Sequence, residues 1–309
     1  MRGSKKEDIK QIIKDSLKEI LPDLIKEISF QVNDFKIPKS PEQKDKRFCY
    51  WTASINKNGT DNGKMTQTLV TSARKAGVLE DFHVYSPDME TLDGGTLHKV
   101  APFDIWGCWF KLDLLLNEVS KLDYEYMIWL DADHYFVRKP RKNLIDFADG
   151  GLVMIPMENQ INSDAKRDVW WSITIKDTID IFRECGVKNE KIYNTNGGLF
   201  IVRKDFIKTF HAMCYDFRAI IKKRTGIDIV EEYCLAIMGN LLNKNINLTT
   251  QENLEEVWAC DWTSQFTNTV PAGQQWRWEN FLSGESKLVN SDIVHVMKGK
   301  PALVNKKWN

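Results

Sequence analysis

The sequence lacks the features that would assign it quickly to a membrane or nucleic-acid-binding class. It has no run of 18 or more apolar residues, so no segment is long enough to span a bilayer. Its early lysines are not followed by the continuous apolar core of a signal peptide. Lys plus Arg and Asp plus Glu both number 43, which leaves neither net charge nor a basic stripe for nucleic acid. These absences favour a cytoplasmic protein that binds no nucleic acid.

Cysteine pairs are also missing. The six cysteines are spread along the chain without a Cys-x-x-Cys pair, which argues against a zinc site and against a dense disulfide framework. We therefore expect free, mostly buried thiols. The 42% hydrophobic content is ample for a large core, and the length suits one catalytic domain with an appendage.

The first 46 residues predict an appendage and a linker. Apolar residues recur at three- and four-residue steps across residues 5–30, as in an amphipathic helix, and Pro22 divides that helix. We interpret residues 1–34 as a helical extension that packs on the body or joins subunits in a homo-oligomer. The mixed charges of its polar face make a membrane surface a poorer partner. Residues 35–46, with Pro38 and Pro41, are expected to be a linker.

From residue 47 onward, strand-like and helix-like segments alternate. This alternation predicts an α/β fold, with a mixed, mostly parallel sheet flanked by helices and ligands at the carboxyl ends of its strands. A Trp-rich stretch over 258–281 is expected to be irregular. Strands are expected at 47–55, 81–86, 124–130, 151–156, 198–202 and 292–296, and helices at 62–76, 105–119, 175–184, 205–223 and 231–242.

The strongest chemical signal is an apolar strand that ends in Asp131-Ala132-Asp133. Two carboxylates at the end of a buried strand repel each other and lose hydration, and a bound divalent cation removes that cost. Oxygen ligands beside a phosphate-bearing partner suit Mn²⁺ or Mg²⁺. A polar loop after a strand would explain the same residues. Haloacid-dehalogenase-type phosphatases share the pattern, but they carry Thr or Val where Tyr135 stands here and place the motif near the start of the chain.

Two further motifs follow. Asn196-Gly197-Gly198 precedes an apolar strand, where the glycines permit close approach of a ligand and the amide can bind sugar hydroxyls, although Asn-Gly is also a common turn. Near the C-terminus, His295 could complete a metal site, while Lys298, Gly299 and Lys300 could close over a diphosphate.

Together the three motifs resemble the GT-A-fold, Asp-x-Asp-containing glycosyltransferases, most closely the glycogenin and lipopolysaccharide-galactosyltransferase type, family 8. The resemblance covers about residues 47–304. It implies a Rossmann-like GT-A domain over 47–309, with a nucleotide-sugar half at 47–140 and an acceptor half at 141–309. It also implies Mn²⁺ bound by Asp131, Asp133 and His295.

The resemblance further implies a set of donor contacts. Thr52 and Ala53 would border the nucleotide base, Lys111 would be the basic residue for the donor, and Asn196 and Gly197 would face the donor sugar. The complete set of expected donor-binding residues is Thr52, Ala53, Lys111, Asp131, Ala132, Asn196, Gly197, Lys298, Gly299 and Lys300.

Acceptor-side candidates are acids and tryptophans. Glu231 and Glu232 open a helix; one of them could be the general base of an inverting reaction or stabilise the charged centre of a retaining one. Acids at this position also satisfy the helix dipole. Several tryptophans could form a sugar platform or pack in the core: Trp170, Trp171, Trp258, Trp262, Trp276 and Trp278.

The resulting expectation is a metal-dependent enzyme that moves a hexose from a nucleoside-diphosphate sugar to a carbohydrate or other hydroxyl acceptor. A UDP-linked donor and retention of configuration are favoured, with a GDP-linked donor as the alternative. One alternative is a non-catalytic protein that binds nucleotide-sugar or carbohydrate on the same fold. A phosphatase is the other. The donor sugar and the acceptor cannot be read from the sequence.

Overall fold

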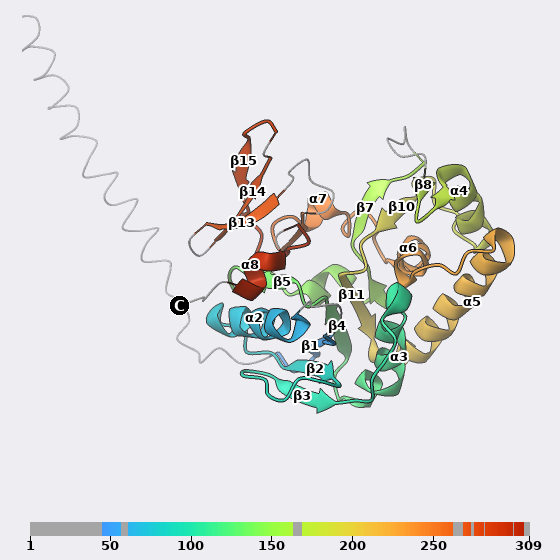
Figure 1. The fold of residues 1–309 in the computed structure, drawn as a ribbon. Helices are drawn as coiled ribbons and strands as arrows, with labels where there is room; N and C mark the ends of the chain where they lie inside the picture. Colours follow the sequence, from blue (N-terminus) through green and yellow to red (C-terminus); the bar gives the residue numbers. More distant parts are fainter. Residues whose placement is uncertain are drawn as a thin grey trace, which may run out of the picture. The chain divides into compact units, whose positions relative to one another are not determined.

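A six-stranded mixed sheet with the order β3-β2-β1-β4-β11-β6 organises the fold (Figure 1). Strands β3, β2, β1 and β4 pair in parallel, and β11 pairs antiparallel with both β4 and β6. An α/β fold with a mixed sheet is therefore confirmed. The strands are β1 (Phe48–Ala53), β2 (Phe82–Ser86), β3 (Thr96–Lys99), β4 (Tyr126–Leu130), β6 (Val153–Met154) and β11 (Leu199–Arg203).

The computed structural model describes the body of the chain. The expected helical extension over 1–34, most of the linker over 35–46, Gly299 and Trp262 lie outside the described residues. Those described are 45–56, 61–162, 169–261, 268–272, 275–280, 282–298 and 300–305.

Helices cover both faces of the sheet. Phe48 and Tyr50 of β1 pack in a core shared with Leu69 of α2, whereas the alternate residue Trp51 packs in a second core shared with helices α3, α5 and α6. Successive residues of β1 are apolar because helices cover both faces of the strand. The helices are α2 (Asn62–Lys75), α3 (Phe110–Asn117), α4 (Ile175–Glu184), α5 (Ile207–Thr225), α6 (Glu231–Leu242), α7 (Gln251–Leu254) and α8 (Lys300–Asn305), and the 3-10 turns are η1 (Trp106–Cys108), η2 (Val119–Lys121), η3 (Leu144–Ala148) and η4 (Lys204–Phe206).

Two sequence-based expectations are wrong in detail. The helix expected over 105–119 is broken, because Gly107 and Cys108 both have left-handed backbones, with φ of 58° and 59°, and α3 begins only at Phe110. The described parts of 258–281 are not irregular, because they contain β12 (Trp258–Cys260), β13 (Asn268–Ala272) and β14 (Gln275–Glu279).

Short strands complete the fold. Two of the small sheets matter for the site: β12-β16-β5, with β16 (Ile293–His295) between its two partners, and the hairpin of β8 and β9. The remaining strands are β5 (His134–Phe136), β7 (Met157–Gln160), β8 (Val169–Trp170), β9 (Ile173–Thr174), β10 (Tyr193–Thr195) and β15 (Ser286–Leu288).

The thiols and helices agree with two other expectations. None of the six cysteines, all of which lie in the described residues, forms a disulfide, and Cys49, Cys214, Cys234 and Cys260 are buried. Within the described part of the chain, no helix is both long enough and apolar enough to cross a bilayer.

Candidate metal and donor site

Asp131, Ala132 and Asp133 form the turn between β4 and β5, at the carboxyl end of the sheet. The backbone N–H of Asp131 donates to the carbonyl of Gly198 at 2.9 Å, and that of His134 donates to the carbonyl of Asp131 at 3.1 Å. The turn is therefore held by one hydrogen bond to Gly198, the residue before β11, and by one hydrogen bond within the turn itself. Asp133 is buried, while the side chain of Asp131 is 29% exposed.

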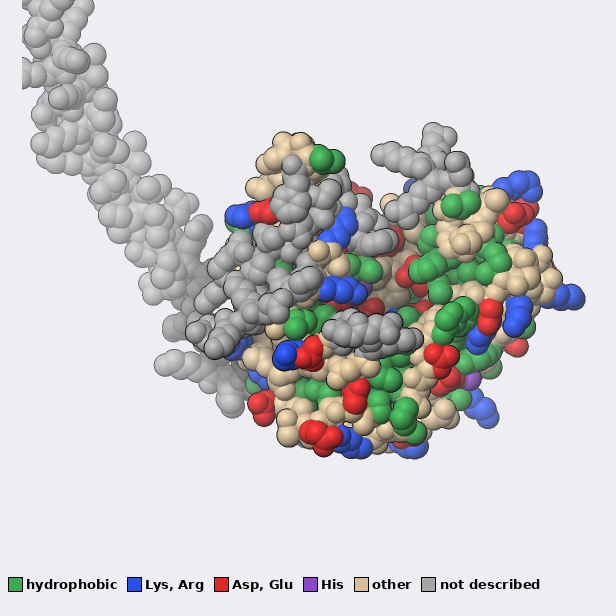
Figure 2. Space-filling model, viewed as in Figure 1, with side chains coloured by type: hydrophobic (Ala, Val, Ile, Leu, Met, Phe, Trp, Pro, Cys, Tyr) green, Lys and Arg blue, Asp and Glu red, His purple; other side chains and the backbone are tan. Residues whose placement is uncertain are grey.

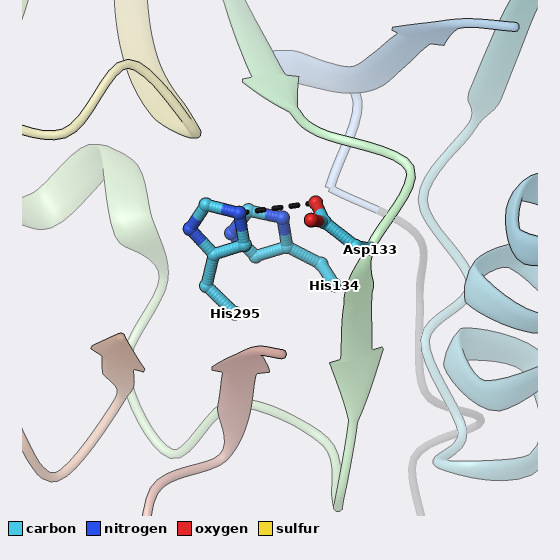
Figure 3. Close-up of side chains that lie close together, drawn as sticks. All are labelled: Asp133, His134 and His295. Atoms are coloured by element: carbon cyan, nitrogen blue, oxygen red, sulfur yellow. Dashed lines mark hydrogen bonds and ion pairs between the residues drawn. The ribbon is translucent and has the colours of Figure 1, made fainter. Parts of the chain in front are cut away.

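Strand pairing brings His295 to this turn. β16 lies antiparallel to β5 with His295 opposite His134, and Val296 N–H donates to the carbonyl of Asp133 at 2.8 Å. His295 Nε2 then lies 3.0 Å from Asp133 Oδ1 (Figure 3). It lies 3.9 Å from Asp131 Oδ2. The three residues expected to hold a metal therefore converge from two distant segments.

His134 belongs to the same cluster, and the ligand atoms of Asp133, His134 and His295 lie within 4.8 Å of one another. Both ring nitrogens of His134 are already used, however. The indole N–H of Trp258 can only donate, at 3.0 Å, so His134 Nε2 accepts, and Nδ1 donates to the carbonyl of Asp131 at 2.9 Å. His134 is thus a neutral ring that stacks on His295 with centroids 4.2 Å apart (Figure 3).

The pKa values agree with these roles. Burial, together with the charge of His295, lowers the pKa of His134 well below its ordinary value. Burial alone would also lower the pKa of His295, but the carboxylate of Asp133 outweighs it and the pKa is raised. Burial would raise the pKa of Asp133, but His295 and Lys300 hold it well below its ordinary value. Asp133 is ionised, and His295 Nε2 carries a proton that a metal ion can replace.

Lys300 completes this group, since its Nζ lies 2.6 Å from Asp133 Oδ2. Its side chain is 44% exposed on the short helix α8, so it can leave Asp133 for an anionic ligand. Lys298 lies before Gly299, and its backbone N–H donates to the buried carboxylate of Asp261. Asp261 thereby anchors the segment that carries both lysines, a role that the sequence did not indicate.

Lys111 lies deeper than expected for a donor-binding residue. Its Nζ lies 3.0 Å from Asp131 Oδ1, 2.8 Å from Glu231 Oε1 and 3.0 Å from the carbonyl oxygen of Gly197, and the side chain is buried. All three ammonium hydrogens are therefore used inside the protein. Burial alone would lower the pKa of Lys111, but Asp131 and Glu231 raise it, so the lysine is charged. Lys111 holds together three segments of the site.

Gly197 and Gly198 lie where side chains of the protein itself leave no room for a Cβ atom. A Cβ on Gly197 would lie 2.8 Å from Glu231 Oε1, and a Cβ on Gly198 would overlap the ring of His295 and lie 2.8 Å from Asn196 Oδ1. Asn196 is buried; its Oδ1 accepts from Gly198 N–H at 2.9 Å, and its Nδ2 contacts Met297 Sδ at 3.3 Å. Sulfur is a weak acceptor, so the amide N–H of Asn196 is the group that could instead donate a hydrogen bond to a sugar hydroxyl.

Glu231 and Glu232 start α6 beside the same turn. Glu232 Oε2 accepts from Gly197 N–H at 3.2 Å, and its Oε1 accepts from the indole N–H of Trp171 at 2.8 Å. Burial and the neighbouring Glu231 raise the pKa of Glu232 to about 7. Burial also raises the pKa of Glu231, although Lys111 opposes the shift. Glu232 is consequently the acid in this site whose pKa suits proton transfer near neutral pH.

The remaining expected donor residues lie along the carboxyl end of the sheet. Thr52 and Ala53 end β1, and the buried hydroxyl of Thr52 has no hydrogen-bond partner, as is also true of Ser54 just beyond it. Ala132 is partly buried within the Asp131–Asp133 turn. Buried hydroxyls without a partner are costly, and a bound polar ligand at this end of β1 would satisfy them.

The expected tryptophan platform is largely core. Trp258, Trp276 and Trp278 are buried. Trp258 donates a hydrogen bond to His134, and the other two tryptophans lie on the inward face of β14. Trp170 is buried as well, but Trp171 is 44% exposed and touches Glu232. Alternation of inward and outward residues in β14 is the signal that could have assigned Trp276 and Trp278 to the core.

The charges of the site leave room for a divalent cation. Four carboxyl groups, those of Asp131, Asp133, Glu231 and Glu232, face the ammonium groups of Lys111 and Lys300 and the protonated ring of His295. When a metal ion replaces the His295 proton, only the two ammonium groups remain to balance the four carboxyl groups. Carboxylate oxygens with one imidazole nitrogen are a donor set that suits Mn²⁺. In the space-filling view, acidic and basic side chains lie in a hollow near the centre of the displayed face (Figure 2).

Comparison with known proteins gives no independent assignment. No protein-family model matches the chain, and no curated protein matches its sequence.

Proposed function

We propose that this chain is a metal-dependent glycosyltransferase of the GT-A type that transfers a hexose from a UDP-linked donor to a carbohydrate or other hydroxyl acceptor. The observation that carries the proposal is the convergence of Asp131, Asp133 and His295 at the carboxyl end of the sheet, with His295 Nε2 3.0 Å from Asp133 Oδ1. Mn²⁺, held by these three residues, would neutralise charge on a departing diphosphate.

The chain's own residues supply the rest of the donor site. In the free protein the ammonium of Lys300 pairs with the carboxylate of Asp133. In the complex it leaves Asp133 and pairs with the negative charge of the diphosphate. Asn196 exchanges its weak contact with Met297 for a hydroxyl of the donor sugar. The hydroxyls of Thr52 and Ser54 hydrogen-bond to the nucleoside.

Glu232 is the residue that we place beside the reacting carbon. Gly197 and Trp171 hold its two oxygens, so the carboxylate is fixed in orientation. In a retaining transfer it would position the acceptor hydroxyl and take its proton as the acceptor oxygen bonds to the anomeric carbon. The bond from that carbon to the diphosphate oxygen breaks, and UDP leaves. Lys111 and Glu231 lie behind it as an internal ion pair that keeps the Gly197 turn in place.

A hydrolysis assay tests the proposal. Purified protein with UDP-glucose or UDP-galactose and Mn²⁺ should release UDP slowly without an acceptor, because water replaces the acceptor hydroxyl. Chelation, Asp133→Ala or Glu232→Gln should each abolish the release. Lys176→Ala, at an exposed ion pair of α4, is the control and should behave as the wild type. Binding of UDP-sugar without turnover would favour the non-catalytic reading, whereas release of phosphate from p-nitrophenyl phosphate would identify a phosphatase.

A further inference from the structure

The hairpin of β8 and β9 presents an exposed tryptophan beside Glu232. Val169 pairs with Thr174 and Trp170 with Ile173, so Trp171 and Ser172 form a two-residue loop. Both loop residues have left-handed backbones, with φ of 49° for Trp171 and 65° for Ser172. Positive φ at both central positions is the signature of a type I′ turn, which normally uses Asn and Gly.

This backbone is costly for the residues that adopt it. Neither Trp nor Ser enters the left-handed region readily, and residues held there concentrate at functional sites. The structure keeps the turn in place through Trp170, which is buried and stacks on Tyr233 with centroids 4.8 Å apart. Tyr233 follows Glu232 directly in α6, so the same helix anchors the hairpin and carries the acid.

The indole of Trp171 is fixed but not covered. Its N–H donates to Glu232 Oε1 at 2.8 Å, which sets the direction of the ring, yet 44% of the residue remains exposed. A tryptophan whose only structural purpose was packing would bury its ring, as Trp170 does. Trp171 instead offers an open aromatic surface next to the carboxylate.

We propose that Trp171 is the acceptor-side wall of the site, where it stacks on the apolar face of a pyranose ring whose hydroxyl reaches Glu232. A pyranose fits both features, since its axial C–H groups suit an aromatic face and its hydroxyls suit a carboxylate. The acceptor class is therefore a carbohydrate rather than an amino-acid or lipid hydroxyl. This inference rests on the proposed function for the identity of the reaction, but the contact with the sugar can be measured without turnover.

The test compares three variants at this turn. Trp171→Gly removes the ring and accepts the left-handed backbone, so relief of backbone strain offsets part of the lost indole contacts and a thermal melt should show a folded variant. Trp171→Phe keeps an aromatic face and loses the N–H. Ser172→Gly relieves the same turn without changing the ring and is the matched control.

The measurement is saturation-transfer-difference NMR with methyl α- and β-glycosides of glucose and galactose. We expect transfer to the protons of one ring face of at least one glycoside in the wild type and in Ser172→Gly, a reduction of about three- to tenfold in Trp171→Gly, and most of the signal in Trp171→Phe. Unchanged transfer in Trp171→Gly, or no transfer from the wild type to any of the glycosides, overturns the proposal. A protein that passes this test but fails to release UDP from UDP-sugars keeps the sugar contact and loses the proposed function.

Discussion

His295 Nε2 lies 3.0 Å from Asp133 Oδ1, although 162 positions separate the two residues along the chain. The contact is built by backbone pairing, since β16 lies against β5 and Val296 N–H donates to the Asp133 carbonyl. A metal-free site can hold an ionised aspartate beside a protonated histidine, and metal binding then releases the histidine proton. This pair is the basis of the functional account.

Proton release accompanies metal binding if His295 is a ligand. Asp133 holds the pKa of His295 well above its ordinary value, so the metal-free ring carries a proton, and only the neutral ring can bind a cation. Mn²⁺ affinity should therefore rise with pH, by up to about tenfold per pH unit, for as long as the free ring is protonated. Calorimetry in two buffers of different ionisation enthalpy should detect about one proton released per Mn²⁺. Affinity independent of pH between about 6 and 8 would exclude His295 as a ligand.

A methyl group on Gly198 should disrupt the metal site, because it would occupy the space of the His295 ring. We expect Gly198→Ala to weaken Mn²⁺ binding by about tenfold or more, since a displaced ligand no longer reaches the ion. Gly63→Ala is the control: its added carbon lies 3.4 Å from Met89 Cγ, and the residue is helical in α2. Calorimetric Mn²⁺ titration of both variants decides the point. Equal affinities would show that the His295 ring is not held where a metal needs it.

Removal of Lys300 should change two affinities in opposite directions. The ammonium competes with a metal for Asp133, so Lys300→Ala should tighten Mn²⁺ binding by about two- to fivefold. The same ammonium is proposed to bind the diphosphate, so UDP affinity in the presence of Mn²⁺ should fall by about tenfold. Titration calorimetry measures both. If the variant loses affinity for Mn²⁺ as well, Lys300 supports the metal site instead of competing with it.

Lys111 should be important for stability because its partners are buried acids. Lys111→Met leaves Glu231 without its counter-ion and should cost about 3–5 kcal/mol of unfolding free energy. Glu231→Gln in the same background should recover at least about 1 kcal/mol, because no charge is then left unpaired at that position. Urea denaturation of the single and double variants gives both values. Lys121→Met, at an exposed pair with Glu118, is the control. Strictly additive losses would argue against the buried ion pair.

Sequence patterns located much of this site. The apolar run before Asp131 predicted the end of β4, and helices α4 and α6 begin and end where the apolar periodicity placed them. The expected ligands Asp131, Asp133 and His295 come together. These predictions held because a buried strand and an amphipathic helix each leave a local signature.

Other features have no local signature. The burial of Lys111 depends on Asp131 and Glu231, which reach it through tertiary packing. The neutral state of His134 depends on Trp258, which lies on another strand of the same small sheet. The short strands β12 and β13 escaped detection because neither shows a periodic pattern over its three to five residues, whereas β14 does alternate. The Trp171 turn escaped detection because its sequence contradicts the usual turn residues.

The most direct test of the account is whether UDP binding requires the metal and Asp133. Calorimetric titration of UDP into the wild type should show binding with Mn²⁺ and a loss of about a hundredfold or more after chelation. Asp133→Asn, which keeps the shape of the side chain, should bind UDP as weakly as the chelated wild type, both with Mn²⁺ and after chelation. Equal UDP affinity in the wild type and in folded Asp133→Asn, with or without Mn²⁺, would contradict the assignment of this site.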